Sequence, residues 1–476
     1  MGELKEKTLS GVKWNAIGRF STQGVSFVIS ILLARILTPS DYGVVGMIGI
    51  FMAIAQTFID SGFGSALIRK KDCTDEDFST AFYFNIVVGI ICYLILFFSA
   101  PLIANFFDTP ILRDIVRVLS INLFLNSLSI VQSAKLTAAV DFKSQAKVSL
   151  AATIVSGCVG LAMAYSGFGV WSLVYQSVSS SVVRTILFWI ITKWRPQRIF
   201  SKQSFKYLFG FGSKILSASL LHTIYVNLTT ILIGKFYKPS DLGYYTRGEH
   251  LANLPSTNLT SILQGVTYPI LAKIQDDDAR LIQVYRKYIR ITSMVIFFGM
   301  FLMAALAEPL ILTLLTDKWQ ESVVFLQVFC FAYMFDHICQ LNLNILYVKG
   351  RSDLVLRLEV IKKTISISMI IAAIPFGVLA ICIARALYTQ IAVIINTYYT
   401  GKLFGLGYFA QVKDFIKYFF FSFLAVLPAF VLSFTSLPSI VALVVGACLA
   451  CLIYWFLLHR NSDFIELLNL VLKRSK

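Results

Sequence analysis

The sequence predicts an all-α polytopic membrane protein with about fourteen transmembrane helices, built from two pseudo-two-fold related six-helix lobes and two C-terminal helices. Hydrophobic residues make up 57% of the 476 residues and charged residues only 14%, whereas about one-quarter of a soluble domain is charged. Segments such as 85–102 and 415–434 approach or reach the roughly 20 apolar residues that a helix needs to cross the hydrocarbon core. A motif that recurs 200 residues along the chain indicates the two lobes.

The individual helices are predicted from apolar runs that end at charged residues, glycine or proline. They cover residues 12–36, 42–67, 79–103, 113–138, 146–165, 169–192, 206–234, 242–272, 288–315, 322–347, 355–375, 377–399, 414–434 and 438–458.

The basic residues are distributed unevenly between the loops. The formal net charge is +17, and if the N-terminus is cytoplasmic, 29 lysines and arginines fall in loops on that side and seven on the other. Cytoplasmic loops of membrane proteins carry an excess of lysine and arginine. We therefore expect both termini in the cytoplasm, and we interpret the positive charge as a sign of topology and not of nucleic-acid binding.

An internal repeat defines the predicted domains. Ile31 begins ILLARILTPSDYG and Ile231 begins ILIGKFYKPSDLG, while GFGVWSLVYQS from Gly167 matches PFGVLAICIAR from Pro375. Two matches in the same order at nearly the same offset indicate repeated halves. Both halves begin on the same side, so the pseudo-two-fold axis should lie along the membrane normal, which suits alternating access around a central cleft. The predicted domains are 1–197 (helices 1 to 6), 198–401 (helices 7 to 12) and 402–476 (helices 13 and 14 with a cytoplasmic tail).

Polar residues inside the first two helices form the first candidate site. Arg19 and Gln23 share one face of the first helix, and Asp60 lies at a similar depth in the second. A charged side chain at membrane depth costs several kcal/mol unless it is paired or hydrated, so such residues are functional candidates by default. We expect Arg19, Gln23 and Asp60 to line a central substrate-binding cavity. The alternative is a buried Arg19–Asp60 ion pair that only locks the helices together.

The eighth predicted helix, 242–272, is more polar than its repeat partner. Arg247, His250 and Asn258 lie on one face and Glu249 on another, so the helix is not expected to face lipid. Pro255 should weaken its hydrogen-bond ladder and permit a kink. We assign Arg247, His250 and Asn258 to the cavity, the alternative being that Arg247 and Glu249 are ordinary interface residues just outside the bilayer.

Three later helices complete the candidate set with Asp336, Lys363 and Arg385. Lys362 and Lys363 cannot both face one cavity, so at least one should snorkel to the cytoplasmic interface, as we also expect of Arg184. Cations outnumber buried acids among these residues, which favours an anionic cargo.

The segment SGVKWNAIGRFSTQGVSFVISILLARILTPSDYGVVGMIGIF, with the later DSGFGSALIRKKD, resembles the polysaccharide-transport branch (Wzx-like flippases) of the multidrug/oligosaccharidyl-lipid/polysaccharide (MOP) superfamily. The resemblance extends over the whole chain in helix number, repeat layout and length. It implies a MATE-like V-shaped pair of lobes with a cationic central cavity and no catalytic residues. It further implies a flippase that moves undecaprenyl-diphosphate-linked oligosaccharide to the outer leaflet of the bacterial inner (plasma) membrane for O-antigen, capsule or exopolysaccharide synthesis.

The same resemblance implies a set of partners. These are the polyprenyl-diphosphate-linked glycan, the lipid bilayer, a polysaccharide polymerase and a chain-length regulator. We expect no cofactor and no metal, and the sequence leaves open whether proton, sodium or chloride drives the cycle.

Two other functions are less consistent with the sequence than a flippase. A membrane polymerase or ligase needs a sizeable extracytoplasmic loop with catalytic residues, but the longest outer loops span only about ten residues. A MATE-like drug or cation antiporter would need buried acids for a positive substrate, and only Asp60, Glu249 and Asp336 qualify. We therefore expect a transporter of anionic lipid-linked sugar and not an enzyme.

Overall fold

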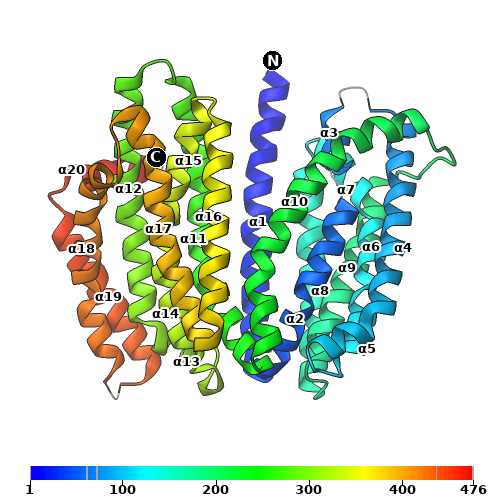
Figure 1. Ribbon diagram of the computed structural model, residues 1–476, viewed down its shortest axis with the longest axis horizontal. Helices are drawn as coiled ribbons and strands as arrows, with labels where there is room; N and C mark the ends of the chain where they lie inside the picture. Colours follow the sequence, from blue (N-terminus) through cyan, green and yellow to red (C-terminus); the bar gives the residue numbers. More distant parts are fainter. Residues whose placement is uncertain (1, 61–62, 71–72, 436, 474–476) are drawn as a thin grey trace. The chain divides into compact units, whose positions relative to one another are not determined.

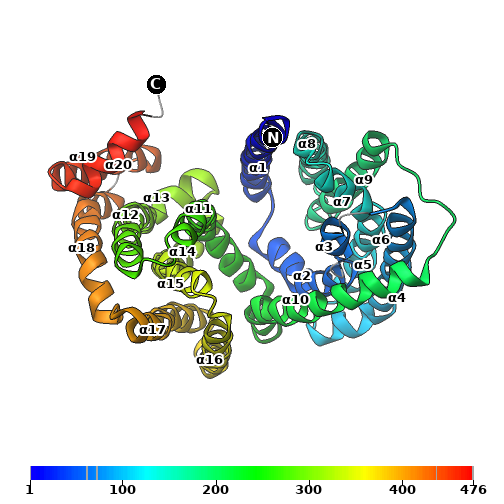
Figure 2. The same cartoon turned by 90° about the horizontal axis from the view of Figure 1, so that it is seen from above.

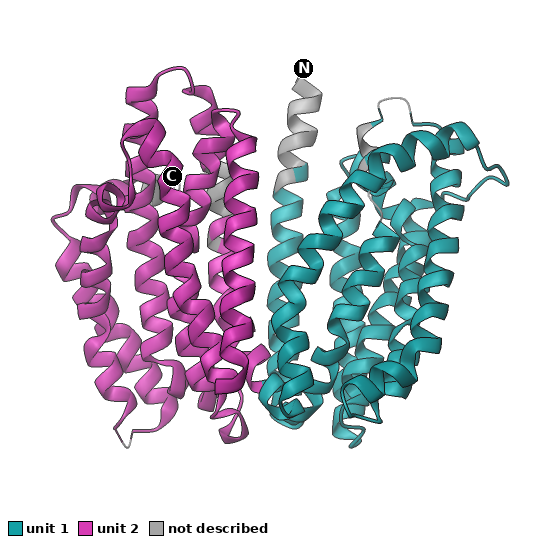
Figure 3. Cartoon of the chain, in the orientation of Figure 1, with its two compact units in different colours: residues 1–243 teal, residues 244–476 magenta. Residues whose placement is uncertain are grey.

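The chain forms two compact units, residues 1–243 and 244–476 (Figure 3). The computed structural model describes residues 2–60, 63–70, 73–435 and 437–473, and all regular secondary structure in these ranges is helical (Figure 1). Unit 1 contains α1 (Gly2–Ile36), α2 (Pro39–Asp60), α3 (Phe63–Arg69), α4 (Asp75–Phe106), α5 (Leu112–Leu119), α6 (Ile121–Ser127), α7 (Ile130–Ala138), α8 (Phe142–Tyr165), α9 (Trp171–Thr192), α10 (Lys202–Phe236) and the start of α11 (Pro239–Lys273). Unit 2 contains the rest of α11, α12 (Asp278–Ala305), α13 (Ala307–Leu314), η1 (Asp317–Trp319), α14 (Ser322–Tyr333), α15 (Asp336–Val348), α16 (Ser352–Ala373), η2 (Ile374–Phe376), α17 (Val378–Phe404), α18 (Tyr408–Ser433), α19 (Ser439–Leu458) and α20 (Ser462–Lys473).

The predicted helical fold is confirmed, but the predicted number of fourteen spans is not. Twelve helical spans in the described chain are long and apolar enough to cross a membrane. All fourteen predicted segments are largely helical, with residues 61–62 of the second outside the described ranges. The two that fall short are α11 and α16. Both are long enough, but the charged and polar side chains along them lower their mean hydropathy.

Two predicted helices are interrupted. The segment 113–138 consists of α5, α6 and α7, and 322–347 consists of α14 and α15. At the breaks in the first segment, the hydroxyl of Ser120 donates to the carbonyl of Arg117 (3.0 Å) and that of Ser129 donates to the carbonyl of Asn126 (3.1 Å). Serine competes with the helical backbone in this way, which explains why a hydrophobic pattern alone predicted one continuous helix.

The boundary between the compact units differs from the predicted lobe boundary at 197/198. Helix α10 packs along α2 and lies in unit 1, so the division falls at Gly243. Small residues bring the two helices together: the hydroxyls of Thr57 and Thr223 are 3.1 Å apart, and a Cβ on Gly234 would lie 3.0 Å from Met47. Membrane helices pack closely where side chains are small.

The repeated Pro-Ser-Asp-x-Gly motif adopts the same local structure in both copies. Pro39 begins α2 and Pro239 begins α11. Proline is favourable at the first position of a helix, because the N–H that it lacks would have no acceptor within the helix. The carboxylate of Asp41 accepts from the backbone N–H of Thr38 (2.8 Å), and Asp241 accepts from that of Lys238 (3.2 Å). Each aspartate thus fixes the turn that starts its helix.

The two copies of the motif also contact each other reciprocally. A Cβ on Gly43 would lie 1.7 Å from the carbonyl oxygen of Pro239, and one on Gly243 would lie 1.9 Å from the carbonyl oxygen of Pro39. Exchanging the two repeats converts one contact into the other, as a two-fold axis between equivalent segments requires. Only glycine allows the backbones this close.

The second sequence match corresponds to a shared turn before α9 and α17. Gly169 has φ +54° and its counterpart Gly377 has φ +101°, a backbone region that favours glycine. Gly169 lies beside the first motif, since a Cβ there would be 3.5 Å from Asp41 Oδ1.

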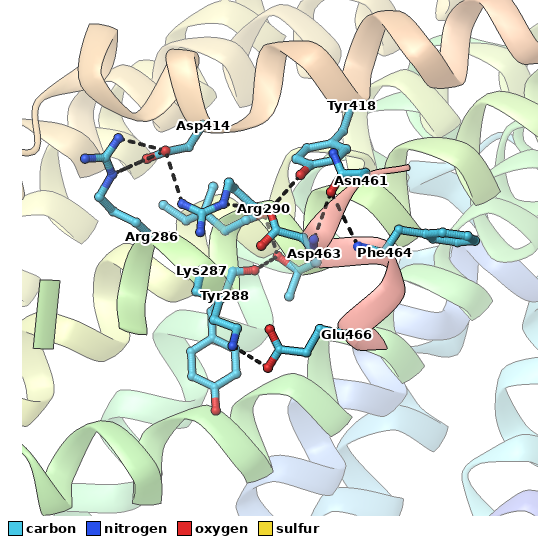
Figure 4. A network of polar contacts seen from close by, with 12 residues as sticks. Arg286, Lys287, Tyr288, Arg290, Asp414, Tyr418, Asn461, Asp463, Phe464 and Glu466 are labelled. Atoms are coloured by element: carbon cyan, nitrogen blue, oxygen red, sulfur yellow. Dashed lines mark hydrogen bonds and ion pairs between the residues drawn. The ribbon is translucent and has the colours of Figure 1, made fainter. Parts of the chain in front are cut away.

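In unit 2, the C-terminal helix α20 is attached to α12 and α18 by charged side chains (Figure 4). Arg286 on α12 binds the carboxylate of Asp414 on α18 through Nε and Nη2, each at 2.9 Å. Arg290 Nε donates to Asp463 Oδ2 on α20 at 2.9 Å, and Tyr418 Oη donates to the same oxygen at 2.9 Å. Although burial favours the neutral acid, these hydrogen bonds hold the pKa of Asp463 below its usual range.

Candidate functional site

A pocket of about 370 Å³ lies between α1 and α8, which run side by side in unit 1 (Figures 1 and 2). The helices approach closely at Gly18, where a Cβ would lie 2.4 Å from the Cβ of Ala146. The predicted residues Arg19 and Gln23 line this pocket, together with Asn15 from the same helix face and Gln145 from α8. The structure therefore places the polar face of α1 along a recess whose wall combines polar side chains with Phe142 and Ala146.

Arg19 is exposed, and among the described residues it has no ion-pair or hydrogen-bond partner. This includes Asp60: the alternative of a locking Arg19–Asp60 pair is not seen. Instead, Asp60 Oδ1 accepts from Gln56 Nε2 (2.9 Å), and Gln56 Oε1 accepts from Asn126 Nδ2 (2.9 Å). The charge of Arg19 is thus available to a ligand within unit 1.

A second pocket adjoins the first, because Thr22 lines both. Its volume is about 450 Å³, and its walls come from α1, α6, α8 and α9. Arg184 on α9 is part of this wall, so it lines a pocket in the helical interior where we expected it to snorkel. The sequence carried one signal for this, the run of serines before Arg184, which gives α9 a polar face.

In unit 2, the predicted residue Arg385 is the centre of a polar cluster formed by α11, α14 and α17. Its Nη1 makes an ion pair with Glu249 Oε1 and donates to Tyr245 Oη at 2.8 Å. Its Nη2 donates to Tyr333 Oη at 3.1 Å, and Tyr333 Oη donates in turn to Glu249 Oε1 at 2.9 Å. The guanidinium also lies 5.3 Å from the centroid of the Phe329 ring.

This arrangement changes the expected role of Arg385. We predicted that it binds an anionic cargo, but here Glu249 neutralises its charge and two tyrosines occupy its donors. Sequence reasoning missed Tyr333, because a tyrosine in an apolar helix carries no distinctive signal.

The other predicted residues on α11 differ in exposure and in contacts. Arg247 is only 5% exposed, and its guanidinium lies 5.8 Å from the centroid of the Trp319 ring. His250 is exposed, and Asn258 Nδ2 donates to the carbonyl of Leu254 on its own helix at 2.8 Å. Helix α11 runs unbroken through Pro255.

Asp336 and the two lysines of α16 lie at different positions in unit 2. Asp336 is half-buried at the first residue of α15. Lys362 is buried and paired with Glu359, while Lys363 is half-buried. The more enclosed of the two is therefore Lys362, whereas we assigned Lys363 to the cavity.

An apolar groove of about 330 Å³ lies between α12, α14 and α18. Phe301, Phe423 and Phe430 line it, with Gln327 as its polar residue. Among the described residues, no group of three or more His, Cys, Asp and Glu side chains could hold a metal ion.

Comparison with known proteins identifies the family. The model of the polysaccharide biosynthesis protein family matches residues 32–324, which is more than half of the chain. This chain belongs to that family. The polysaccharide biosynthesis protein is 25% identical over 357 residues to the teichuronic acid biosynthesis protein TuaB of Bacillus subtilis, and the match covers 74% of each chain. It is 24% identical over 412 residues to the lipopolysaccharide biosynthesis protein WzxC of Escherichia coli, covering 86% of this chain and 82% of WzxC.

The fold of this chain is similar to those of two solved membrane proteins. The lipid II flippase MurJ, in an inward closed conformation, superposes with a TM-score of 0.75 at 14% identity, over 93% of this chain and 97% of MurJ. An inward-facing multidrug resistance MATE transporter of the MOP superfamily gives a TM-score of 0.62 at 14% identity, over 80% of this chain and 94% of that one. The predicted all-α fold is thereby confirmed.

Proposed function

We propose that this protein is a flippase that carries undecaprenyl-diphosphate-linked oligosaccharide from the cytoplasmic to the outer leaflet of the bacterial inner membrane by alternating access. Its relatives are named for the biosynthesis of teichuronic acid, lipopolysaccharide and succinoglycan, and the last is described as a transport protein. The fold is similar to that of a lipid II flippase. These findings support a lipid-linked saccharide as the cargo.

The observation that carries the proposal is the free guanidinium of Arg19. Helix α1 runs from Gly2 to Ile36, and its stretch Lys13–Ile36 is long and apolar enough to cross a membrane, so Arg19 lies within a spanning helix. A cation at this depth is costly unless a ligand or water compensates it. A diphosphate crossing hydrocarbon needs its charge and hydration replaced, and a guanidinium does this through paired hydrogen bonds. The amides of Asn15, Gln23 and Gln145 in the same pocket can bind sugar hydroxyls.

The environment of the buried acids disfavours a cation exporter. Such a transporter needs carboxylates that are free to bind a positive substrate. Glu249 is neutralised by Arg385, and Asp60 is hydrogen-bonded to Gln56. The apolar groove at Phe301 and Phe423 can instead accommodate part of an isoprenoid chain.

The proposal is tested by measuring which leaflet displays the lipid-linked glycan. In spheroplasts of a host that lacks the chromosomal copy, a lectin or glycosidase reports outward-facing glycan. We expect Arg19→Gln to reduce this display at least tenfold, and Arg19→Lys to retain part of it because the charge remains. Lys13→Gln, a basic residue of the same helix outside the pocket, is the matched control.

Two results would contradict the flippase function. One is wild-type display in cells that contain no copy of this chain. The other is loss of glycan on both leaflets at equal protein levels, because that would indicate a role in synthesis and not in translocation. If a properly inserted Arg19→Gln variant displayed as much glycan on the outer leaflet as wild type, Arg19 would have no role in the mechanism.

A further inference from the structure

The pocket that contains Arg184 has the composition of an anion site. The residues that line it carry hydroxyl and amide groups, with one guanidinium and no carboxylate. Ser26 and Thr22 come from α1, Asn126 from α6, and Ser180 and Ser181 from α9. Hydroxyl and amide groups can donate hydrogen bonds to an anion, and no acid in the wall competes for the cation.

Arg184 has no ion-pair or hydrogen-bond partner in the described part of the chain. It is exposed to the pocket, and no described residue makes an ion pair or hydrogen bond with its guanidinium. The spanning helix α9 ends at Thr192, so Arg184 lies about 12 Å from that end and about 20 Å from the other. Arg184 therefore lies well inside its spanning helix. An unpaired cation at this depth calls for a ligand of opposite charge.

The position of Arg184 is fixed by hydrogen bonds on both sides of it. Along α9, the hydroxyl of Ser177 accepts from Asn122 Nδ2 at 2.9 Å, and the hydroxyl of Thr185 donates to the carbonyl of Leu125 at 3.0 Å. One turn further on, Trp189 Nε1 donates to the carbonyl of Leu128 at 2.9 Å. These contacts hold α9 against α6 in one rotation. The backbone at Arg184 is thus fixed so that its side chain projects from the pocket wall, and a fixed position of the helix lowers the cost of ordering on binding.

The pocket also contains a polar atom that lacks a partner. The hydroxyl oxygen of Thr22 is buried and makes no hydrogen bond within the described chain. Buried polar groups are rarely left unpaired, and an orphan usually marks the place of a missing ligand or solvent molecule. Because Thr22 belongs to both pockets, it marks where the Arg184 and Arg19 recesses meet.

We infer that the Arg184 pocket is a phosphate-binding site, in which the guanidinium, the hydroxyls of Ser180 and Ser181, and that of Thr22 bind the anion. The inference rests on the proposed flippase function, for which the carrier lipid supplies a diphosphate. The same chemistry would bind free inorganic phosphate or pyrophosphate. The pocket volume of about 450 Å³ is in the range of ordinary small-ligand sites, and it is larger than a single phosphate group requires.

The test is direct binding to the purified full chain in lipid nanodiscs, followed by calorimetry. Two probes are titrated separately: farnesyl diphosphate, which is a short prenyl diphosphate, and inorganic pyrophosphate. We expect Arg184→Gln to weaken binding about ten- to hundredfold, which is the usual loss of affinity when hydrogen bonds to a charged group are removed. Arg184→Lys should lose less, because it keeps the charge. Arg195→Gln is the matched control, since Arg195 binds the backbone carbonyls of Trp189 and Trp194 outside the pocket.

The outcomes distinguish a lipid diphosphate from free phosphate as the ligand, and they distinguish failure of the site from failure of the proposed function. Binding of both probes identifies the phosphate groups as the recognised feature, and binding of farnesyl diphosphate alone identifies the lipid. Failure of the wild-type chain to bind either probe overturns the inference, as does an Arg184→Gln variant that binds within threefold of wild type. Neither result affects the leaflet assay. A chain that binds diphosphate through Arg184 but displays no glycan would refute the flippase function and leave the site standing.

Discussion

The reciprocal glycine contacts predict that adding one methyl group to Gly43 destabilises unit 1. A Cβ at this position would lie 1.7 Å from the carbonyl oxygen of Pro239, whereas real Cβ contacts are essentially never shorter than 3.0 Å. The backbones of α2 and α11 would have to separate by more than 1 Å. The obstacle is a main-chain carbonyl at the start of a helix, which cannot rotate away as a flexible side chain would.

The expected size of the effect follows from two opposing contributions. Overpacking a close contact typically costs about 1–3 kcal/mol, and a gap of about 1 Å forfeits up to half of the dispersion energy of neighbouring contacts, such as that of Gly234 with Met47. Replacing glycine by alanine within a helix also stabilises the fold by up to about 1 kcal/mol, because alanine has the higher helix propensity. We therefore expect Gly43→Ala to be destabilising by about 2 kcal/mol, equivalent to a fall in Tm of roughly 4–8 °C for a unit of this size.

The assay is thermal unfolding of the purified protein in detergent, with Gly49→Ala as the matched control. Gly49 belongs to the same helix and has no atom within 4 Å of an added Cβ, so its alanine variant should be neutral or more stable than wild type. Gly243→Ala should resemble Gly43→Ala. The double variant should lose less than the sum, because one separation of the segments relieves both clashes. A Gly43→Ala variant as stable as Gly49→Ala would refute the reasoning.

Two further predictions concern unit 2. Glu249→Gln should lower the free energy of unfolding by about 2–3 kcal/mol, since it leaves the charge of Arg385 uncompensated. Adding Arg385→Gln to the same chain should recover part of this loss, as measured by thermal unfolding. If the effects of the two substitutions were fully additive, the pair would not be coupled. The lowered pKa of Asp463 means that its ionised form stabilises the docking of α20 above its ordinary pKa of about 3.9, and this contribution is lost as pH falls below about 4 through the folded-state pKa. A nitroxide on α20 should become mobile in that range by electron paramagnetic resonance, whereas Asp463→Asn should remove the pH dependence. A pH-independent signal in the wild-type chain would contradict this.

The sequence was sufficient to predict the helices and their repetition. Apolar runs of spanning length leave no other solution than helices in a bilayer, and a turn motif at the same place in both halves predicted an internal repeat. The interruptions in 113–138 and 322–347 could not be predicted in this way. A serine that bonds back to the preceding turn leaves the hydrophobic pattern unchanged.

Which charges are free could not be predicted from the sequence. Arg19 and Arg385 look alike there, each an arginine in an apolar helix. The difference is Glu249, which is 136 residues from Arg385 along the chain and becomes its neighbour only when α11 packs against α17. Arg184 was misjudged for a related reason. Whether it reaches the interface or a pocket depends on the rotation of α9, which is set by hydrogen bonds to α6.

The arginines within the spanning helices have different surroundings in the two units, and this bears on mechanism. In unit 1, the charges of Arg19 and Arg184 are unpaired among the described residues and line adjoining pockets. In unit 2, Arg385 is neutralised by Glu249, and Arg247 is covered by Trp319. Binding an anion at Arg385 would first require breaking its ion pair, at a cost that Arg19 and Arg184 avoid. In the conformation described, unit 1 should therefore make the first contacts with a phosphate. Arg385 can contribute only in a state in which Glu249 has moved away from it.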